Sequence, residues 1–241
     1  MQEHQEKQVS ALAALDEPTR RRLYGHVVRQ SGPVSRDEAV AALGVPRATV
    51  AFHLDRLVDE GLLDVVFERR TGRTGPGAGR PAKLYRRSAC EVAVSLPERH
   101  YELAGRLLAA ALEEADRSGT SPRAALGRRA YETGRGLAEA AGPAGHGNSA
   151  RIAALSLLEG QGYEPRVEGA GVALVNCPFH LLAHEHTELV CGMNLRLIDG
   201  VLDGLGSTGL AAHLYPTPAR CCVRLEPGSD VAATRSGGAR E

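Results

Sequence analysis

Apolar residues recur at helical spacing from near the start of the chain, and turn residues divide this pattern into segments. Residues 8–29 are predicted to form a helix with an apolar stripe of Leu12, Leu15, Leu23 and Val27. Pro18 lies inside this stretch and lacks a backbone N–H donor, so the helix is expected to break or kink there. The sequence Ser31-Gly32-Pro33 predicts the turn that follows.

Two shorter helices are predicted next. Ser35, with Glu38 three residues later, has the pattern of a capping box and predicts a helix that ends at Gly44. Pro46 suits the first turn of a further helix, which ends at Gly61. The apolar face of that helix contains Val50, Leu54, Leu57 and Val58.

A hairpin is predicted after these helices. Residues 62–67 and 82–87 are predicted to form its strands, and the segment 71–81, rich in glycine and proline, would connect them. A helix, a turn, a second helix and a hairpin make the order of a winged helix-turn-helix. In such domains the second helix lies in the major groove of DNA.

The remainder of the chain predicts an α+β fold. Helices are expected over 97–117 and 122–140, followed by a glycine-rich break at 142–147. Beyond it the pattern predicts helices over 149–160 and 180–204 and strands over 163–168, 171–176, 210–215 and 220–226. The expected organisation is a winged helix-turn-helix domain at 8–90, a helical linker or dimerisation segment at 97–141, a cysteine-containing α+β sensor domain at 148–226 and a disordered tail at 227–241.

Composition narrows the class of protein. Hydrophobic residues make up 43% of the 241 residues, which excludes global disorder. The chain lacks the apolar run of about 18 residues that a membrane span needs, and residues 1–10 lack the apolar core of a secretory signal. A cytoplasmic location is therefore expected, in which the five cysteines serve as thiols or metal ligands rather than as disulfides.

Charge is distributed unevenly along the neutral chain. Residues 1–90 contain 15 basic and 11 acidic residues, so the remainder is acidic. Residues 64–90 contain seven basic residues and two acidic residues, Asp64 and Glu68. Basic residues beside a helical pair indicate a polyanionic partner, with a solvated charged loop as the alternative.

The predicted DNA contacts follow from the apolar stripe. Because Val50, Leu54 and Leu57 must face the core, the outward side of their helix would carry Arg47, Thr49, Phe52, His53 and Arg56. For His53 a half-buried position is equally compatible with the pattern. The hairpin would reach phosphates or the minor groove with Arg69, Arg70, Arg73, Arg80 and Lys83. The alternative is a helix-turn-helix that serves as a protein interface.

Two motifs in this region carry a family resemblance. The run 45–62 reads Val-Pro-Arg-Ala-Thr-Val-Ala-Phe-His-Leu-Asp-Arg-Leu-Val-Asp-Glu-Gly-Leu and resembles the recognition helix of ArsR-type winged-helix regulators. The run 79–85 reads Gly-Arg-Pro-Ala-Lys-Leu-Tyr and resembles the wing of the same group. The resemblance covers residues 10–90 and implies binding to a double-stranded DNA operator.

Four cysteines fall near the C-terminal end, with the spacing Cys177-x13-Cys191-x29-Cys221-Cys222. Cys177 is expected at the end of a strand and Cys191 at the start of a helix, where the helix N-terminus favours a thiolate. Cys221 and Cys222 are expected on a strand with opposite orientations, so that one joins any shared site. Cys90 stands apart and is expected to be a small buried hydrophobe.

Three converging cysteines suit a soft metal ion or an iron–sulfur cluster, because thiolates are the usual ligands of both. Two alternatives stay open. The cysteines are buried and inert, or zinc is bound by Cys177, His180, Cys191 and one later cysteine.

A second resemblance concerns this region. The segments Asn-Cys-Pro-Phe-His at 176–180, His-Thr-Glu-Leu-Val-Cys at 186–191 and Cys-Cys-Val-Arg-Leu at 221–225 resemble the sensor domain of SufR-type repressors. The resemblance spans residues 10–226 and implies a dimeric repressor with an iron–sulfur cluster. Its cysteine positions match Cys177, Cys191 and Cys222. Some members have another cysteine where 192–220 has none, so Cys221, His180 or a non-protein ligand would fill the remaining position.

The resulting hypothesis is a DNA-binding repressor controlled by an iron–sulfur cluster; the alternative is a winged-helix regulator that responds to zinc or a small ligand. A homodimer is expected through an apolar seam of Tyr101, Leu103, Leu107, Leu108 and Leu112, unless this face packs on its own C-terminal domain. An enzyme is not expected. His184 and Glu185 begin a zinc-protease pattern, but Glu188 stands where its second histidine would be.

Overall fold

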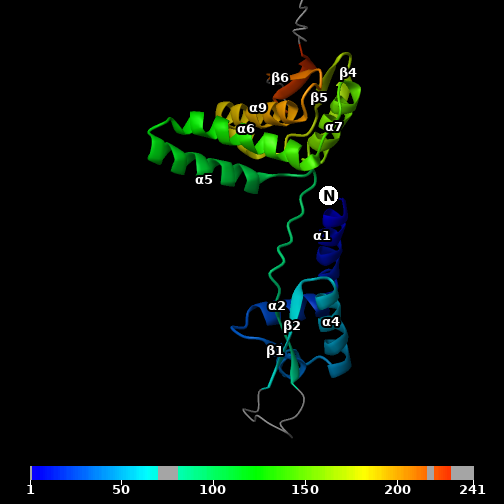
Figure 1. Cartoon of the computed structure of the whole chain (residues 1–241). Coiled ribbons are helices and arrows are strands. Elements are labelled where there is room, and N and C mark those ends of the chain that lie inside the picture. Colours follow the sequence, from blue (N-terminus) through cyan, green and yellow to red (C-terminus); the bar gives the residue numbers. More distant parts are fainter. Residues whose placement is uncertain (1, 70–80, 216–219, 229–241) are drawn as a thin grey trace, which may run out of the picture. The chain divides into compact units, whose positions relative to one another are not determined.

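The computed structural model describes residues 2–69, 81–215 and 220–228 (Figure 1). The chain divides into two compact units, Met1–Val94 and Ser95–Glu241, here called unit 1 and unit 2. Most of the predicted wing tip, with Arg70, Arg73 and Arg80, lies outside the described residues, as does the tail from 229. Within the described residues, no helix is both long and apolar enough to cross a membrane.

Unit 1 begins with two helices where the sequence predicted one interrupted helix. Helix α1 spans Gln2–Ala14 and α2 spans Pro18–Val28, so the first helix starts earlier than expected and the break at Pro18 is confirmed. The Glu17 carboxylate accepts hydrogen bonds from the backbone N–H groups of Thr19 (3.0 Å) and Arg20 (2.6 Å). Glu17 therefore caps α2, because these N–H groups have no hydrogen-bond partner inside the helix.

The helix-turn-helix follows. Helix α3 spans Arg36–Leu43, has the predicted capping box between Ser35 and Glu38, and ends at Gly44, whose φ is +66°. Helix α4 spans Arg47–Asp59 and is preceded by Pro46. These local signals were sufficient to place both helices, and α4 is the predicted recognition helix.

A small antiparallel sheet completes unit 1. Strands β2 (Leu63–Glu68) and β3 (Ala82–Arg87) form the expected hairpin, and β3 also pairs with β1 (Val34–Ser35), a strand too short to show in the sequence pattern. The described strands lie in the order β1-β3-β2. Helices and hairpin share one core, which includes Leu23, Val27, Val50, Leu54, Leu57, Leu63 and Tyr85.

Unit 2 combines helices with a second antiparallel sheet. Its helices are α5 (Tyr101–Ser118), α6 (Pro122–Ala141), α7 (Asn148–Glu159), α8 (His180–Glu185) and α9 (Thr187–Leu205). Its described strands are β4 (Pro165–Glu168), β5 (Gly171–Leu174), β6 (Leu210–Leu214) and β7 (Val223–Pro227), in the order β4-β5-β7-β6. Every predicted element of this region has its counterpart within a few residues.

Helices α6 and α9 pack very closely along their length (Figure 1). A Cβ atom at Gly134 would overlap the carbonyl oxygen of Leu197, and one at Gly200 would overlap the carbonyl oxygen of Tyr131. Glycine is required at both positions because two backbones meet there. The segment expected as a separate linker at 97–141 therefore shares one core with the segment expected as the sensor domain.

Candidate functional site

Helix α4 presents one polar face to solvent. Arg47 and Arg56 are exposed, Thr49 is half-buried, and Phe52 is 64% exposed, while Val50, Leu54 and Leu57 point into the core. Exposed Phe52 has an apolar ring that suits contact with a thymine methyl group. Thr49, Phe52 and Arg56 therefore lie on one face, Arg47 is exposed in the first turn, and His53 is the exception in the predicted outward set.

His53 is removed from the DNA-facing set by the structure. Its side chain is buried, and Nε2 lies 3.5 Å from Oε2 of Glu17 at the start of α2. Its Nδ1 is buried and has no hydrogen-bond partner among the described residues. The half-buried alternative describes this residue better than a base contact, because His53 lies next to Leu54 at the edge of the apolar stripe.

The exposed arginines of α4 are held by acidic neighbours. Arg56 pairs with Glu60 one turn along the helix, and Arg47 pairs with Asp37 of α3. Both arginine side chains are at least half exposed, so these pairs are weak in water. DNA phosphates or base edges can therefore replace the carboxylates.

Asp55 joins three elements of unit 1 at the base of the wing. Its carboxylate accepts hydrogen bonds, all of 2.7 Å, from the guanidinium of Arg36, the ammonium of Lys83 and the hydroxyl of Tyr85. Arg36 also donates to the Tyr85 hydroxyl at 2.8 Å. Because these residues belong to α3, α4 and β3, the network fixes the hairpin against the predicted recognition helix.

The network changes the ionisation of its members. Burial acts to raise the pKa of Asp55, but the hydrogen bonds from Lys83, Tyr85 and Arg36 outweigh it and lower the pKa. Burial and the hydrogen bond to Asp55 raise the pKa of Tyr85. Lys83 was predicted to contact DNA, and the structure gives it this internal partner, while Arg69 is exposed. Helical periodicity gave no signal for Asp55, since it reports burial and not partners across the fold.

The four C-terminal cysteines are all buried in the core of unit 2. Cys191 and Cys222 form a disulfide, with 6.2 Å between their Cα atoms, although thiols or metal ligands were expected. Cys191 lies in the second turn of α9, because that helix begins at Thr187 and not at the cysteine. Cys221 and Cys222 precede β7, so the expected strand alternation does not apply and both are buried.

Cys177 and Cys221 make a second pair. The interaction between the two thiols lowers the pKa of Cys177, and together with burial it raises the pKa of Cys221. The side-chain amide of Asn194 donates to the Cys221 sulfur at 3.2 Å, and the Tyr163 hydroxyl donates to the Asn194 carbonyl oxygen. Asn194 and Tyr163 are buried, so this polar chain is enclosed in the core.

Hydrogen bonds hold the chain around Cys177 in place. Arg99 donates a hydrogen bond to the Cys177 carbonyl oxygen at 2.8 Å, and the neighbouring Asn176 donates to the carbonyl oxygen of Glu98 at 3.2 Å. The backbone N–H of Cys221 donates to the carbonyl oxygen of Leu174 at 3.1 Å. The end of β5 and the segment before β7 are thereby held side by side.

The other predicted ligands lie elsewhere. His180 is exposed at the start of α8, as are His184 and His186 near its end. Cys90 is exposed in unit 1 and is not the buried hydrophobe that was expected. Among the described residues, the side chains of Cys, His, Asp and Glu do not form a group of three set for a metal ion. Cysteine sulfur is the usual donor for iron–sulfur clusters and soft metals, but Cys191 and Cys222 are joined in a disulfide here and only Cys177 and Cys221 are buried thiols.

A cavity of about 210 Å³ lies against Cys221. Tyr215, Arg220 and Arg224 line it together with apolar residues of β5 and β7. Arg220 and Arg224 both pair with Glu168, at 2.8 and 2.9 Å. Because Tyr215 and Arg220 are exposed, the cavity connects the Cys221 region with the protein surface.

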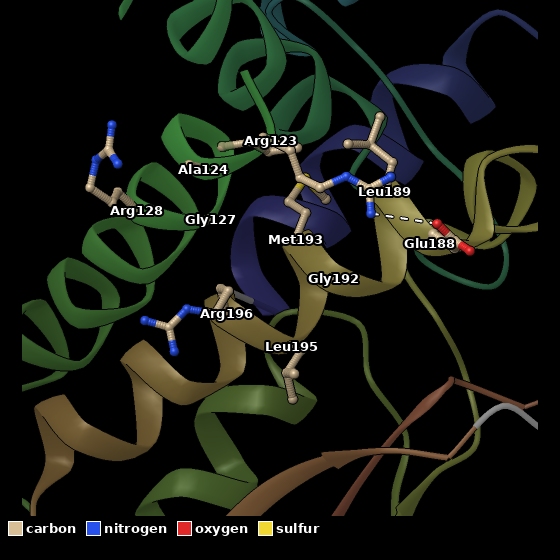
Figure 2. Close-up of a pocket in the computed structure, with 11 residues that line it drawn as sticks. Arg123, Ala124, Gly127, Arg128, Glu188, Leu189, Gly192, Met193, Leu195 and Arg196 are labelled. Carbon is tan, nitrogen blue, oxygen red and sulfur yellow. Dashed lines mark ion pairs between the residues drawn. The ribbon is translucent and has the colours of Figure 1, made fainter. Parts of the chain in front are cut away.

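A larger cavity of about 410 Å³ lies between α6 and α9 (Figure 2). Three arginines surround its apolar floor, and each is paired with an acid: Arg123 with Glu188, Arg128 with Glu114 and Arg196 with Asp199. Figure 2 shows the Arg123–Glu188 pair closing one end.

Comparison with known proteins identifies the helix-turn-helix region of unit 1. A family model described as a helix-turn-helix domain matches residues 15–66, which run from the end of α1 to β2. The match supports a winged helix-turn-helix regulator and indicates a DNA-binding transcriptional regulator. No curated protein and no solved structure matches the chain.

Proposed function

We propose that the chain is a dimeric repressor of transcription whose affinity for DNA depends on an iron–sulfur cluster held by the cysteines of unit 2. DNA binding rests on the helix-turn-helix match. The observation that carries the sensing role is the burial of four cysteine sulfurs in one core, paired with one another. Cysteine thiolates are the usual ligands of iron–sulfur clusters and of soft metal ions.

Unit 1 supplies the DNA contacts. The face of α4 with Phe52 and Arg56 would enter the major groove with Arg47 in the first turn of the helix, and Arg69, just after β2, would contact the backbone. The Asp55 network holds the hairpin in place, so wing and recognition helix would bind as one rigid surface. A regulator bound in this way represses when its operator overlaps the promoter.

Dimerisation is proposed through α5. This helix packs along α6 and lies at the outer edge of unit 2 (Figure 1). Leu107 of the predicted seam is buried inside the unit, but Leu112 is 55% exposed and Leu108, one turn before it, is half-buried. A second copy would cover these leucines and place two recognition helices on one operator.

The proposed cluster ligands are Cys177, Cys191 and Cys222, with Cys221 as the fourth sulfur. Cys221 is preferred to His180 because it is buried and hydrogen-bonded, whereas His180 is exposed. A bound cluster supplies a redox-active centre. Asn194 would orient the Cys221 sulfur with its N–H···S bond, and the surrounding core would exclude water.

The disulfide and the cluster are alternative states of the same sulfurs. Metal ligation needs thiolates, so Cys191 and Cys222 must be reduced before they can bind iron. Their side chains already adjoin, which lowers the entropy cost of bringing two ligands together. The proposal therefore predicts that metal loading requires a reductant.

The test is purification without oxygen, followed by iron, acid-labile sulfide and zinc analysis. The wild type should be brown and contain iron and sulfide, and Cys177→Ser, Cys191→Ser and Cys222→Ser should each lose most of the iron. Cys90→Ser is the matched control, because Cys90 is exposed in unit 1, and should keep it. A colourless protein with bound zinc would support the zinc-responsive alternative instead.

The regulatory step needs a separate measurement. Gel-shift affinity for the operator should change by about tenfold when the cluster is removed, within the usual range of coupling between two sites. Equal affinity with and without the cluster would contradict cluster control while leaving the DNA-binding assignment intact.

A further inference from the structure

Helices α6 and α9 leave a cavity between them in the N-terminal half of each helix. Further along, the two backbones come so close that a Cβ atom at Gly134 or Gly200 would overlap the other helix. Before that contact, residues within 123–128 and 188–196 line the cavity of about 410 Å³ (Figure 2). This volume falls within the range of about 300–1,000 Å³ that is usual for sites of small molecules.

Two glycines help to keep this cavity open. Gly127 and Gly192 both line it. A Cβ atom at Gly192 would meet nothing within 4 Å, and one at Gly127 would meet Cγ of Arg196 at 3.6 Å, which is an ordinary contact. Close packing therefore does not require glycine here, as it does at Gly134 and Gly200. Glycine inside a helix is less favourable than alanine, and what these two glycines provide is space.

The floor of the cavity is apolar. It includes Leu126 and Met193, which are buried, and Leu189 and Leu195, which are half-buried and keep part of their surface exposed. Covering this surface with an apolar group would remove it from water, which is favourable. The floor therefore suits the apolar body of a ligand.

The charges around the floor are unequally placed. Among the described residues that line the cavity, Arg123, Arg128 and Arg196 are basic and Glu188 is acidic. Glu188 pairs with Arg123 at one end, and Figure 2 shows Arg128 and Arg196 on the side away from it. A negative group is therefore favoured beside Arg128 and Arg196 and is repelled from the end that contains Glu188.

Arg196 is held in place with hydrogen-bond donors to spare. Its Nη1 donates to Oδ2 of Asp199 at 2.8 Å, and its guanidinium lies over the ring of Tyr131, 4.8 Å from the centroid. Among the described residues, its Nε and Nη2 have no hydrogen-bond partner. These two donors form the edge of a guanidinium that binds a carboxylate with two parallel hydrogen bonds. Arg196 can therefore accept a carboxylate without losing Asp199.

We propose that this cavity binds a small carboxylic acid with an apolar body, of the size of a medium-chain fatty acid. The carboxylate accepts hydrogen bonds from Nε and Nη2 of Arg196, on the side of the cavity that carries Arg128. The chain covers the apolar floor and fills the space beside Gly127 and Gly192. Because such a ligand contacts both α6 and α9, its binding stabilises unit 2. The site requires neither a metal ion nor a cluster.

Calorimetric titration of the full chain tests both parts of the ligand. Decanoate should bind at one site per chain. Decanol, which has the same chain without the charge, should bind about tenfold more weakly or worse, because the charge-assisted hydrogen bonds are lost. Acetate, which has the charge without the chain, should show no measurable binding. Absence of decanoate binding, or equal binding of decanoate and either of the other two compounds, would overturn the proposal.

A filled cavity tests the location. Gly192→Leu should keep the fold, because a Cβ atom there meets nothing within 4 Å and leucine favours helix. Its affinity for decanoate should fall by about tenfold or more, and the rise in Tm that decanoate causes in the wild type should vanish. Gly136→Leu is the matched control, since Gly136 is exposed on α6 and an added Cβ meets nothing there either. Equal affinity in both variants would place the ligand elsewhere.

A change of charge tests the contact with the carboxylate. Arg196→Gln should lose the preference for decanoate over decanol and keep the affinity for decanol. Arg135→Gln is the matched control, because Arg135 is exposed on α6 and pairs with Glu139 outside the cavity. A preference that survives in Arg196→Gln would contradict the assigned contact.

Light scattering distinguishes a ligand site from a contact between chains. The wild type and Gly192→Leu should have the same molar mass, with and without decanoate. A lower mass for Gly192→Leu would mean that a second copy of the chain covers the cavity, and it would overturn the ligand proposal. All these measurements use metal-free chain, so failure of the cluster proposal would not be mistaken for failure of this one.

Discussion

The two units place their functional groups in opposite environments. In unit 1 the side chains proposed to contact DNA are exposed on α4 and β2, and the core beneath them is apolar. In unit 2 the cysteines are part of the core itself, next to a buried hydrogen-bonded chain of Tyr163 and Asn194. Changes at the site of unit 1 should therefore affect binding more than folding. Changes near the site of unit 2 should affect both.

The strongest test of this contrast is Gly200→Ala. A Cβ atom at Gly200 would overlap the Tyr131 carbonyl oxygen of α6, and backbone cannot move aside as a flexible side chain can. The free energy of unfolding of the variant, measured in urea, should fall by about 3 kcal/mol or more. The metal binding proposed for the cysteines of unit 2 should be lost with it.

Gly136→Ala is the matched control for Gly200→Ala. Gly136 is exposed on α6, and an added Cβ meets nothing within 4 Å. Alanine should stabilise this position by about 0.5–1 kcal/mol, because it favours helix more than glycine does. Equal effects of the two substitutions would mean that α6 and α9 do not pack as described.

Leu112→Glu tests the surface of unit 2 in place of its core. Leu112 is exposed on α5, so a charge there should leave the free energy of unfolding within about 0.5 kcal/mol of wild type in the monomer. In a dimer through α5 the same charge would be buried beside its symmetry mate. Light scattering should therefore show a shift from dimer to monomer; an unchanged dimer would place the interface elsewhere.

Arg56→Ala and Arg69→Ala separate two kinds of DNA contact in unit 1. Loss of Arg56 from α4 should cost about 1–3 kcal/mol on the specific operator and relax specificity at one position. Loss of Arg69 from the hairpin should weaken all sequences alike and reduce the salt slope by about 1. Equal losses on specific and random DNA for both variants would mean that α4 is not the recognition helix.

The sequence predicted unit 1 through local signals. The capping box at Ser35, the proline before α4 and the glycine at 44 each determine the backbone nearby, and α3 and α4 begin and end where these signals lie. The strand β1 was not predicted, because two residues are too few to show an alternation of apolar and polar positions. The role of Asp55 was not predicted, because its three partners belong to α3 and β3 and only the fold brings them together.

The cysteine region shows a different limit. Spacing and strand order correctly placed Cys177 after β5, yet Cys191 was expected one turn earlier in its helix and Cys222 on a strand face. Both differences arise from shifts of a few residues in element boundaries, which decide what a side chain faces. The position of Cys221 depends on its backbone hydrogen bond to Leu174 and on Asn194, neither of which leaves a pattern in the sequence.

The smallest expected effect concerns acid stability of unit 1. The pKa of Asp55 is lowered in the folded chain below its ordinary value of 3.8. A lowered carboxyl pKa adds stability above pH 3.8, and this contribution is lost as the pH falls through the folded value. Asp55→Asn should cost about 1 kcal/mol near neutral pH, because solvent reaches the carboxylate and weakens each ion pair.

The pH dependence distinguishes Asp55 from a merely structural residue. Between about pH 5 and pH 2, the urea midpoint of the wild type should fall by more than that of Asp55→Asn, so the two curves converge in acid. Asp59→Asn is the matched control, since Asp59 is exposed on the same helix, and it should follow the wild type at every pH. Parallel curves for the wild type and Asp55→Asn would mean that the carboxylate charge does not hold the wing. The hairpin would then be fixed to α4 by packing of the buried Tyr85 ring, and Lys83 would be available to DNA.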